Sequence, residues 1–176
     1  ISVAAQNCHQ TESGAFTGEV SAVSLQSFGC DYCIVGHSER RQYFGEDDKL
    51  INEKIVQLLA KNIKPIYCCG ESLEQRQSEE HFEVVGEQIQ SAFSGLKRED
   101  LLKIVVAYEP VWAIGTGETA TPKQAQEMHA FIREKLSQVL RDEAENVSIL
   151  YGGSVKPDNA KELFSQKDID GGLIGG

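Results

Sequence analysis

The alternation of short apolar runs with amphipathic helical stretches constrains the fold of this chain more than any other feature. Each run is rich in β-branched and apolar residues, and helical patterns lie between successive runs. Nearly continuous apolar strands that alternate with helices are typical of a parallel sheet buried on both faces. We therefore expect an α/β fold, either a doubly wound sheet or a (β/α) barrel. The predicted strands are residues 2–5, 32–35, 63–68, 104–108, 147–151 and 173–174, and the predicted helices are residues 19–28, 47–61, 78–93, 122–141 and 156–164.

The composition is that of an ordinary soluble protein domain. The 176 residues, 40% of them hydrophobic, suffice for a sizeable core, so we expect a single domain over residues 1–176. No apolar run approaches the roughly 18 residues of a membrane span, and the first residues lack the basic region of a secretory signal, which favours a cytoplasmic location. The formal net charge of −10 disfavours nucleic acid and anionic membranes as partners.

Five cysteines are an odd number in a chain too large to need disulfides, which indicates reduced thiols. Cys30 and Cys33 form a C-x-x-C pattern, but Cys33 opens an apolar run rather than a helix, and no second, well-spaced ligand pair accompanies it. We interpret these cysteines, with the adjacent pair Cys68 and Cys69, as small apolar strand residues, and we expect no metal.

The stretch IVGHSERR, residues 34–41, predicts a strand that delivers His37 to its C-terminal end. A helix then begins near Ser38 or Glu39. A helix N-terminus disfavours positive charge, so we expect a neutral imidazole that can donate a hydrogen bond to a substrate oxygen and relay protons. The alternative is a histidine that only caps the helix.

Glu109 directly follows the apolar run 105–108, where a strand leaves the core. A carboxylate there is partly desolvated, which raises its basicity. The next residues are apolar and end in glycines, as expected for a lid that excludes water when it closes. The alternative is a surface glutamate beside a packed tryptophan. A G-x-G-x-x-A pattern also starts in this loop, but its first glycine does not follow the strand immediately, as a dinucleotide site requires. The predicted lid comprises Val111, Trp112, Ala113, Ile114, Gly115 and Thr116.

Paired glycines end the last two runs, in YGGS at residues 151–154 and GGLIGG at residues 171–176. They expose backbone N–H groups, which suits a phosphate group, and neighbouring final strands of barrel enzymes commonly form such a site. The alternative is a pair of glycine turns with no binding role.

Five stretches carry a resemblance to a known family: IVGHSERR, CGE, AYEPVWAIGTG, LYGGSV and DIDGGLIGG. In this order and spacing they resemble the triosephosphate isomerase family over essentially the whole chain. The resemblance implies a (β/α)8 TIM barrel, here a partial barrel of about six βα units, since the family has eight units in about 250 residues. We expect the first predicted strand to correspond to the family's third. The N-x-K strand end that supplies the family's catalytic lysine then lies outside these residues.

The resemblance also implies roles for individual residues. Glu109 is the base that moves a proton between adjacent carbons of dihydroxyacetone phosphate and glyceraldehyde 3-phosphate, and neutral His37 polarises the carbonyl, with Ser38 and Glu39 in support. The lid closes over the substrate, and no cofactor or metal is needed. The loop around residues 12–18, with Thr17 near its tip, implies a homodimer. Backbone groups of Gly115, Ser154, Gly175 and Gly176 hold the phosphate.

Two further hypotheses remain open from the sequence. The chain is either most of an active isomerase or a non-catalytic fragment or assembly module. The second hypothesis rests on the missing lysine, because a dianionic substrate would bind poorly without that cation to a chain of net charge −10. Another phosphate-binding barrel enzyme fits the expected fold, but not the motifs around His37 and Glu109.

Overall fold

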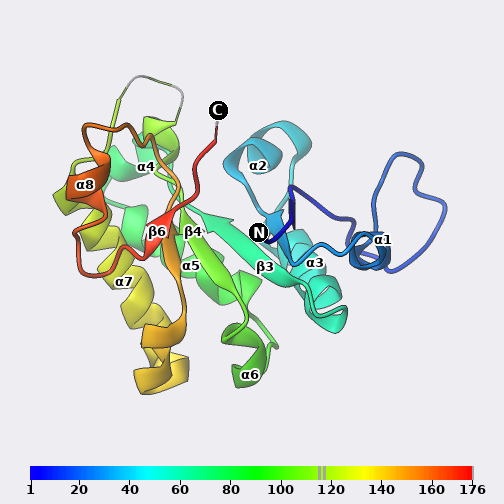
Figure 1. Cartoon of the computed structure of the whole chain (residues 1–176). Coiled ribbons are helices and arrows are strands. Elements are labelled where there is room, and N and C mark those ends of the chain that lie inside the picture. The colour runs from blue at the N-terminus through cyan, green and yellow to red at the C-terminus, as the bar shows by residue number, and fades with distance from the viewer. Residues whose placement is uncertain (115, 117, 176) are drawn as a thin grey trace.

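A single six-stranded parallel sheet organises the structure, a computed structural model that describes residues 1–114, 116 and 118–175 (Figure 1). The strands are hydrogen-bonded in chain order, β1 to β6, and the curled sheet forms part of a (β/α) barrel. A doubly wound sheet would reverse its order at a switch point, so the barrel alternative is confirmed. The strands are β1 (Ala4–Ala5), β2 (Tyr32–Val35), β3 (Lys64–Cys69), β4 (Val105–Tyr108), β5 (Ile149–Tyr151) and β6 (Gly171–Gly172).

The last strand lies two residues before its predicted position. Gly171 and Gly172 pair with Leu150 and Tyr151 of β5, whereas the apolar residues 173–174 follow the strand. Strand pairing uses backbone groups alone, so two glycines can occupy this strand although their composition predicts a turn. The prediction of a strand at residues 173–174 was therefore wrong.

Helices connect the strands and pack on the sheet. The start of α7 follows its sequence signal: Thr121 caps the helix, Pro122 is its first residue, and Gln124 completes the capping box. The predicted helix at residues 78–93 begins only at His81, because Glu79 adopts a φ of 60°. No described helix is long and apolar enough to cross a lipid bilayer. The helices are α1 (Ala22–Ser27), α2 (Ser38–Phe44), α3 (Asp48–Ala60), α4 (Leu73–Gln77), α5 (His81–Ala92), α6 (Arg98–Leu101), α7 (Pro122–Leu140) and α8 (Ala160–Leu163), with 3-10 turns η1 (Val111–Ala113) and η2 (Arg141–Asn146).

The core lies between the sheet and the long helices α3, α5 and α7. Alternate strand residues point to opposite faces of a sheet, and Val35, Tyr67 and Val106 point into this core. Ile34, of the opposite parity, lines a cavity at the carboxyl end of the sheet. The helices thus cover one face of the strands, and the strand ends are free to carry the functional side chains.

Candidate functional site

The carboxyl ends of the strands surround a cavity of about 710 Å³. His37 comes from the end of β2 and Glu109 from the end of β4, 72 residues further along the chain. Gly152 and Ser154 follow β5, and Gly175 follows β6. Parallel strands bring these distant stretches together at one edge, which is where barrel enzymes place their chemistry.

His37 is the N-cap of α2, and this position fixes its tautomer. Nδ1 accepts a hydrogen bond from the backbone N–H of Glu39 at 3.3 Å, so this nitrogen carries no proton in the neutral ring. The proton of the neutral imidazole is therefore on Nε2, which lies 3.0 Å from Oε1 of Glu109. His37 presents an N–H donor toward the cavity and the carboxylate.

The contact with Glu109 overturns the expected direction of the His37 pKa. The hydrogen bond with the Glu109 carboxylate raises the pKa of His37, and partial burial, which lowers it, is the smaller effect. Glu39 adds a weaker attraction, with its carboxylate 3.9 Å from Nδ1. The helix start alone predicts a lowered pKa, but it is outweighed while Glu109 occupies Nε2.

Glu109 is almost fully buried, with 2% of its surface exposed. Ser38 donates its backbone N–H to Oε2 at 2.9 Å and its hydroxyl to Oε1 at 3.3 Å. The backbone N–H of Glu109 donates to the carbonyl oxygen of Cys69 at 2.7 Å, which continues the ladder between β3 and β4. His37 and Ser38, the two residues at the start of α2, thus hold the carboxylate beside the cavity.

Two glycines allow the backbone to pass closely by Glu109. A Cβ on Gly70 would lie 1.7 Å from the carbonyl oxygen of Glu109, and a Cβ on Gly152 would lie 3.0 Å from Cγ of Glu109. No side chain fits at Gly70 without a backbone shift. This close approach is the physical reason for the glycine of the CGE stretch, which sequence reasoning did not assign.

The predicted lid begins as the η1 turn and is anchored by a residue that sequence reasoning missed. Glu71 is fully buried, and its Oε1 accepts hydrogen bonds from Nε1–H of Trp112 at 2.9 Å and from the hydroxyl of Tyr108 at 3.0 Å. Arg76 donates to the same oxygen at 3.1 Å and its guanidinium lies 5.5 Å from the Trp112 ring centroid. The only signal in the sequence was a carboxylate at the end of a strand, like Glu109 itself.

Three further residues of the predicted lid contact the cavity, its lining or Trp112. Ala113 is buried and its carbonyl oxygen accepts from the Ser154 hydroxyl at 2.9 Å. Ile114 lines the cavity, and Thr116 donates its hydroxyl to the Trp112 carbonyl oxygen at 2.9 Å. Of the residues predicted to bind phosphate, Ser154 and Gly175 line the cavity, while Gly115 and Gly176 lie outside the described residues.

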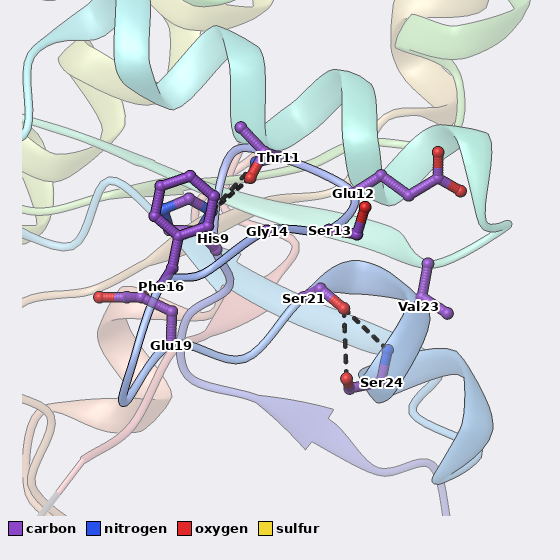
Figure 2. A pocket seen from close by; sticks show the side chains of 10 residues that line it. All are labelled: His9, Thr11, Glu12, Ser13, Gly14, Phe16, Glu19, Ser21, Val23 and Ser24. Carbon is purple, nitrogen blue, oxygen red and sulfur yellow. Dashed lines mark hydrogen bonds between the residues drawn. The ribbon is translucent and has the colours of Figure 1, made fainter.

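Thr17 does not line this cavity. The loop around residues 12–18, which contains it, projects from the body of the molecule near α1 (Figure 1). The loop folds over a second hollow of about 510 Å³ (Figure 2). Inside it, the Phe16 ring packs on His9 with ring centroids 4.1 Å apart, and Nδ1 of His9 lies 2.8 Å from the Thr11 hydroxyl. The structure therefore does not bring Thr17 to His37 and Glu109 within one chain.

The cysteines are free thiols. Cys33 lies in β2 and Cys68 and Cys69 in β3, all three buried, which confirms that they are apolar strand residues. Cys30 precedes β2 and is only partly buried, so its interpretation as a strand residue was wrong. Burial raises the pKa of the Cys68 thiol, and the nearby Glu109 carboxylate raises it further. Within the described part of the chain, no group of three or more histidine, cysteine, aspartate or glutamate residues could hold a metal ion.

Comparison with known proteins gives one consistent result. The family model described as "Triosephosphate isomerase" matches residues 1–176. A triosephosphate isomerase of Herminiimonas arsenicoxydans is 56% identical over 176 residues, which is 100% of this chain and 71% of the relative. The enzymes of the same name from Phocaeicola vulgatus and Flavobacterium johnsoniae are each 57% identical over 177 residues, with 100% of this chain and 70% and 71% of the relatives covered.

Proposed function

The chain belongs to the triosephosphate isomerase family, and we propose that Glu109 and His37 interconvert dihydroxyacetone phosphate and glyceraldehyde 3-phosphate through an enediolate. The observation that carries these roles is the contact of 3.0 Å between Nε2 of His37 and Oε1 of Glu109 at the wall of the strand-end cavity. A base and a hydrogen-bond donor side by side suit a reaction that takes a proton from carbon while charge develops on the neighbouring oxygen.

The substrate carbonyl takes the place of the Glu109 carboxylate at His37. Nε2–H then donates to the carbonyl oxygen, and the freed carboxylate removes the proton from the adjacent carbon. The electron pair of the broken C–H bond forms the enediolate, whose oxygen charge is stabilised by the imidazole N–H. His37 passes its Nε2 proton to this oxygen and takes a proton from the hydroxyl on the neighbouring carbon, so the O–H proton moves from one oxygen to the other. Return of the carbon-bound proton from Glu109 to the other carbon then completes the isomerisation. Nδ1 stays an acceptor throughout, because the Glu39 N–H needs it.

The proposed lid directly follows the base in the chain, so one movement of this segment can both exclude solvent and reposition the carboxylate. η1 begins two residues after Glu109, so closure of residues 111–116 moves the backbone beside the base and displaces water from it. We place the substrate phosphate at Ser154 and Gly175, which line the cavity, and at Gly115 and Gly176. This placement is supported by the glycine-rich ends of β5 and β6.

The chemistry proposed here uses side chains and backbone groups alone, without a cofactor or metal. The partners are a small phosphorylated triose and a second copy of the chain, which the loop at residues 12–18 contacts through Thr17. The exposed Phe16 ring, 46% exposed, supports this interface. The net charge of −10 argues against nucleic acid and membranes as partners, and the free thiols suit the reducing cytoplasm.

Substitution of the base tests the proposal. Glu109→Gln keeps the size of the side chain but cannot accept the carbon-bound proton, so turnover of glyceraldehyde 3-phosphate in a coupled assay should fall at least 10²- to 10⁴-fold, the usual contribution of a general base. Glu53→Gln, an exposed residue of α3, is the matched control and should leave turnover unchanged.

Each other outcome points to a specific failure. Wild-type turnover in Glu109→Gln would overturn the role of the base. No turnover in the unaltered polypeptide, with its circular dichroism spectrum intact, would instead favour the non-catalytic assembly module.

A further inference from the structure

Arg41, which the mechanism does not use, lies across the ends of two neighbouring strands. Its Nε donates to the carbonyl oxygen of Gly36 at 2.9 Å and its Nη2 to that of Cys68 at 3.2 Å. The third donor, Nη1, lies 2.6 Å from Oδ1 of Asp48, the first residue of α3. The side chain is only one-fifth exposed, at 20%.

The guanidinium of Arg41 donates hydrogen bonds to both chain segments just beyond the end of the hydrogen-bonded ladder between β2 and β3. The register of β2 and β3 runs from Tyr32 with Lys64 to Val35 with Tyr67. Gly36 then turns away with a φ of 73°, and a Cβ there would lie 3.1 Å from the Cys68 carbonyl oxygen. Beyond the last strand pair, Arg41 links the two chain segments through a rigid fork of donors.

Each of the two carbonyl groups belongs to the residue just before one that positions the catalytic pair. Gly36 precedes His37 in the chain. Cys68 precedes Cys69, whose carbonyl oxygen accepts the backbone N–H of Glu109 at 2.7 Å. The distance between the ends of β2 and β3 therefore determines the relative positions of the His37 and Glu109 backbones, and so of their side chains.

We propose that Arg41 is a positioning residue that holds His37 and Glu109 in contact by clamping the carbonyl ends of β2 and β3. The inference rests on the roles proposed above for these two residues. An ammonium cannot replace the clamp, because it lacks the planar set of donors that reaches two carbonyls and a carboxylate together. A misplacement of about 1 Å costs roughly 10²-fold in rate, so the clamp matters although Arg41 touches no substrate.

The test compares Arg41→Lys with Asp48→Asn. Arg41→Lys keeps the positive charge but loses the fork, whereas Asp48→Asn removes the charged partner and leaves both carbonyl bonds. The readout is the pKa of His37 from the pH titration of its imidazole proton resonances, which requires no turnover. The groups that face the ring are Glu109 at Nε2 and Glu39 at Nδ1, so Glu109→Gln supplies the value for a lost contact.

In Arg41→Lys, the pKa of His37 should move at least halfway from the wild-type value to that of Glu109→Gln. In Asp48→Asn it should move less than a quarter of that distance. In the isomerase assay, kcat of Arg41→Lys should fall about 10-fold or more, with KM changed less than twofold.

Three results would overturn the proposal: an unchanged His37 pKa in Arg41→Lys, an equal shift in Asp48→Asn, or an Arg41→Lys polypeptide that fails to fold while Asp48→Asn folds. The last result would assign Arg41 to stability. Because the titration is independent of catalysis, full turnover in Glu109→Gln would refute the proposed function and still leave the clamp tested.

Discussion

His129 shows how one buried side chain ties stability to pH. The ring belongs to the buried face of α7, and its Nδ1 lies 3.1 Å from the carbonyl oxygen of Asp168. A neutral ring donates Nδ1–H to that oxygen, while Nε2 has no hydrogen-bond partner among the described residues. Burial lowers the pKa of His129 to about 4, so the folded protein holds this ring neutral at pH 5 to 7.

The lowered pKa predicts a loss of stability in mild acid. The unfolded chain binds the proton near the ordinary value of 6.5 and the folded chain only near 4, so the stabilisation is complete above pH 6.5 and is lost as pH falls. The difference corresponds to about 3 kcal/mol in the free energy of unfolding. Urea denaturation at pH 7, 6, 5 and 4.5 should show a shallower slope for His129→Gln than for the wild type.

His37 provides the control of opposite sign. Its pKa is raised, so its contribution is complete below pH 6.5 and is lost as pH rises through the folded-state pKa. His37→Asn should therefore change the slope of the stability curve above pH 6.5, and below pH 6.5 it should lower the curve by a constant amount without changing its slope. A His129→Gln curve parallel to the wild type between pH 6.5 and 4.5 would contradict the assignment of the acid slope to His129.

At the scale of elements, the segment proposed as a lid is attached to the body of the protein by one carboxylate. Three donors on three elements, from Trp112, Tyr108 and Arg76, converge on Oε1 of Glu71. Glu71→Gln would leave the part-buried Arg76 without its counter-charge and place an amide N–H₂ among donors. We expect a destabilisation of about 1–3 kcal/mol, the range for an unsatisfied buried polar group.

Trp112 is the only tryptophan in the sequence, so its fluorescence reports the lid directly. In Glu71→Gln the emission maximum should shift to the red and acrylamide quenching should increase, because the indole loses its buried acceptor. Glu134→Gln, on the exposed face of α7, is the matched control. Unchanged emission in Glu71→Gln would show that the lid is held by apolar packing instead.

At this scale, elements with a local sequence signal were predictable and elements fixed by long-range pairing were not. The start of α7 was predictable because Thr121, Pro122 and Gln124 form a local capping signal. β6 was not, because Gly171 and Gly172 carry no side-chain pattern and their pairing with β5 is a long-range choice.

The same distinction applies to the site. The positions of His37 and Glu109 at strand ends could be predicted because each follows an apolar run. The direction of the His37 pKa and the anchoring role of Glu71 could not, because both depend on contacts between segments 37 to 72 residues apart in the chain.

At the scale of the whole molecule, the charge imbalance acts on the fold. The chain has 27 acidic and 17 basic residues, and the resulting charge of −10 repels itself in the compact state. Exposed ion pairs such as Lys103 with Asp100 oppose this effect, but each contributes only about 0–1 kcal/mol. Added salt screens both kinds of interaction, with a Debye length of about 10 Å at 0.1 M.

We expect the repulsion to dominate, so salt should stabilise the protein at neutral pH. Raising NaCl from 10 to 150 mM at pH 7.5 should increase Tm by roughly 2–4 °C, the shift that about 1 kcal/mol gives in a chain of this size. Near pH 4.9, the isoelectric point of the sequence, the net charge vanishes and the increase should disappear. A chloride salt is required, because sulfate or phosphate could also occupy the phosphate site proposed above for the glycine-rich strand ends. If Tm falls with NaCl at pH 7.5, the ion pairs outweigh the net charge, and the fold is held by local attraction despite its acidic surface.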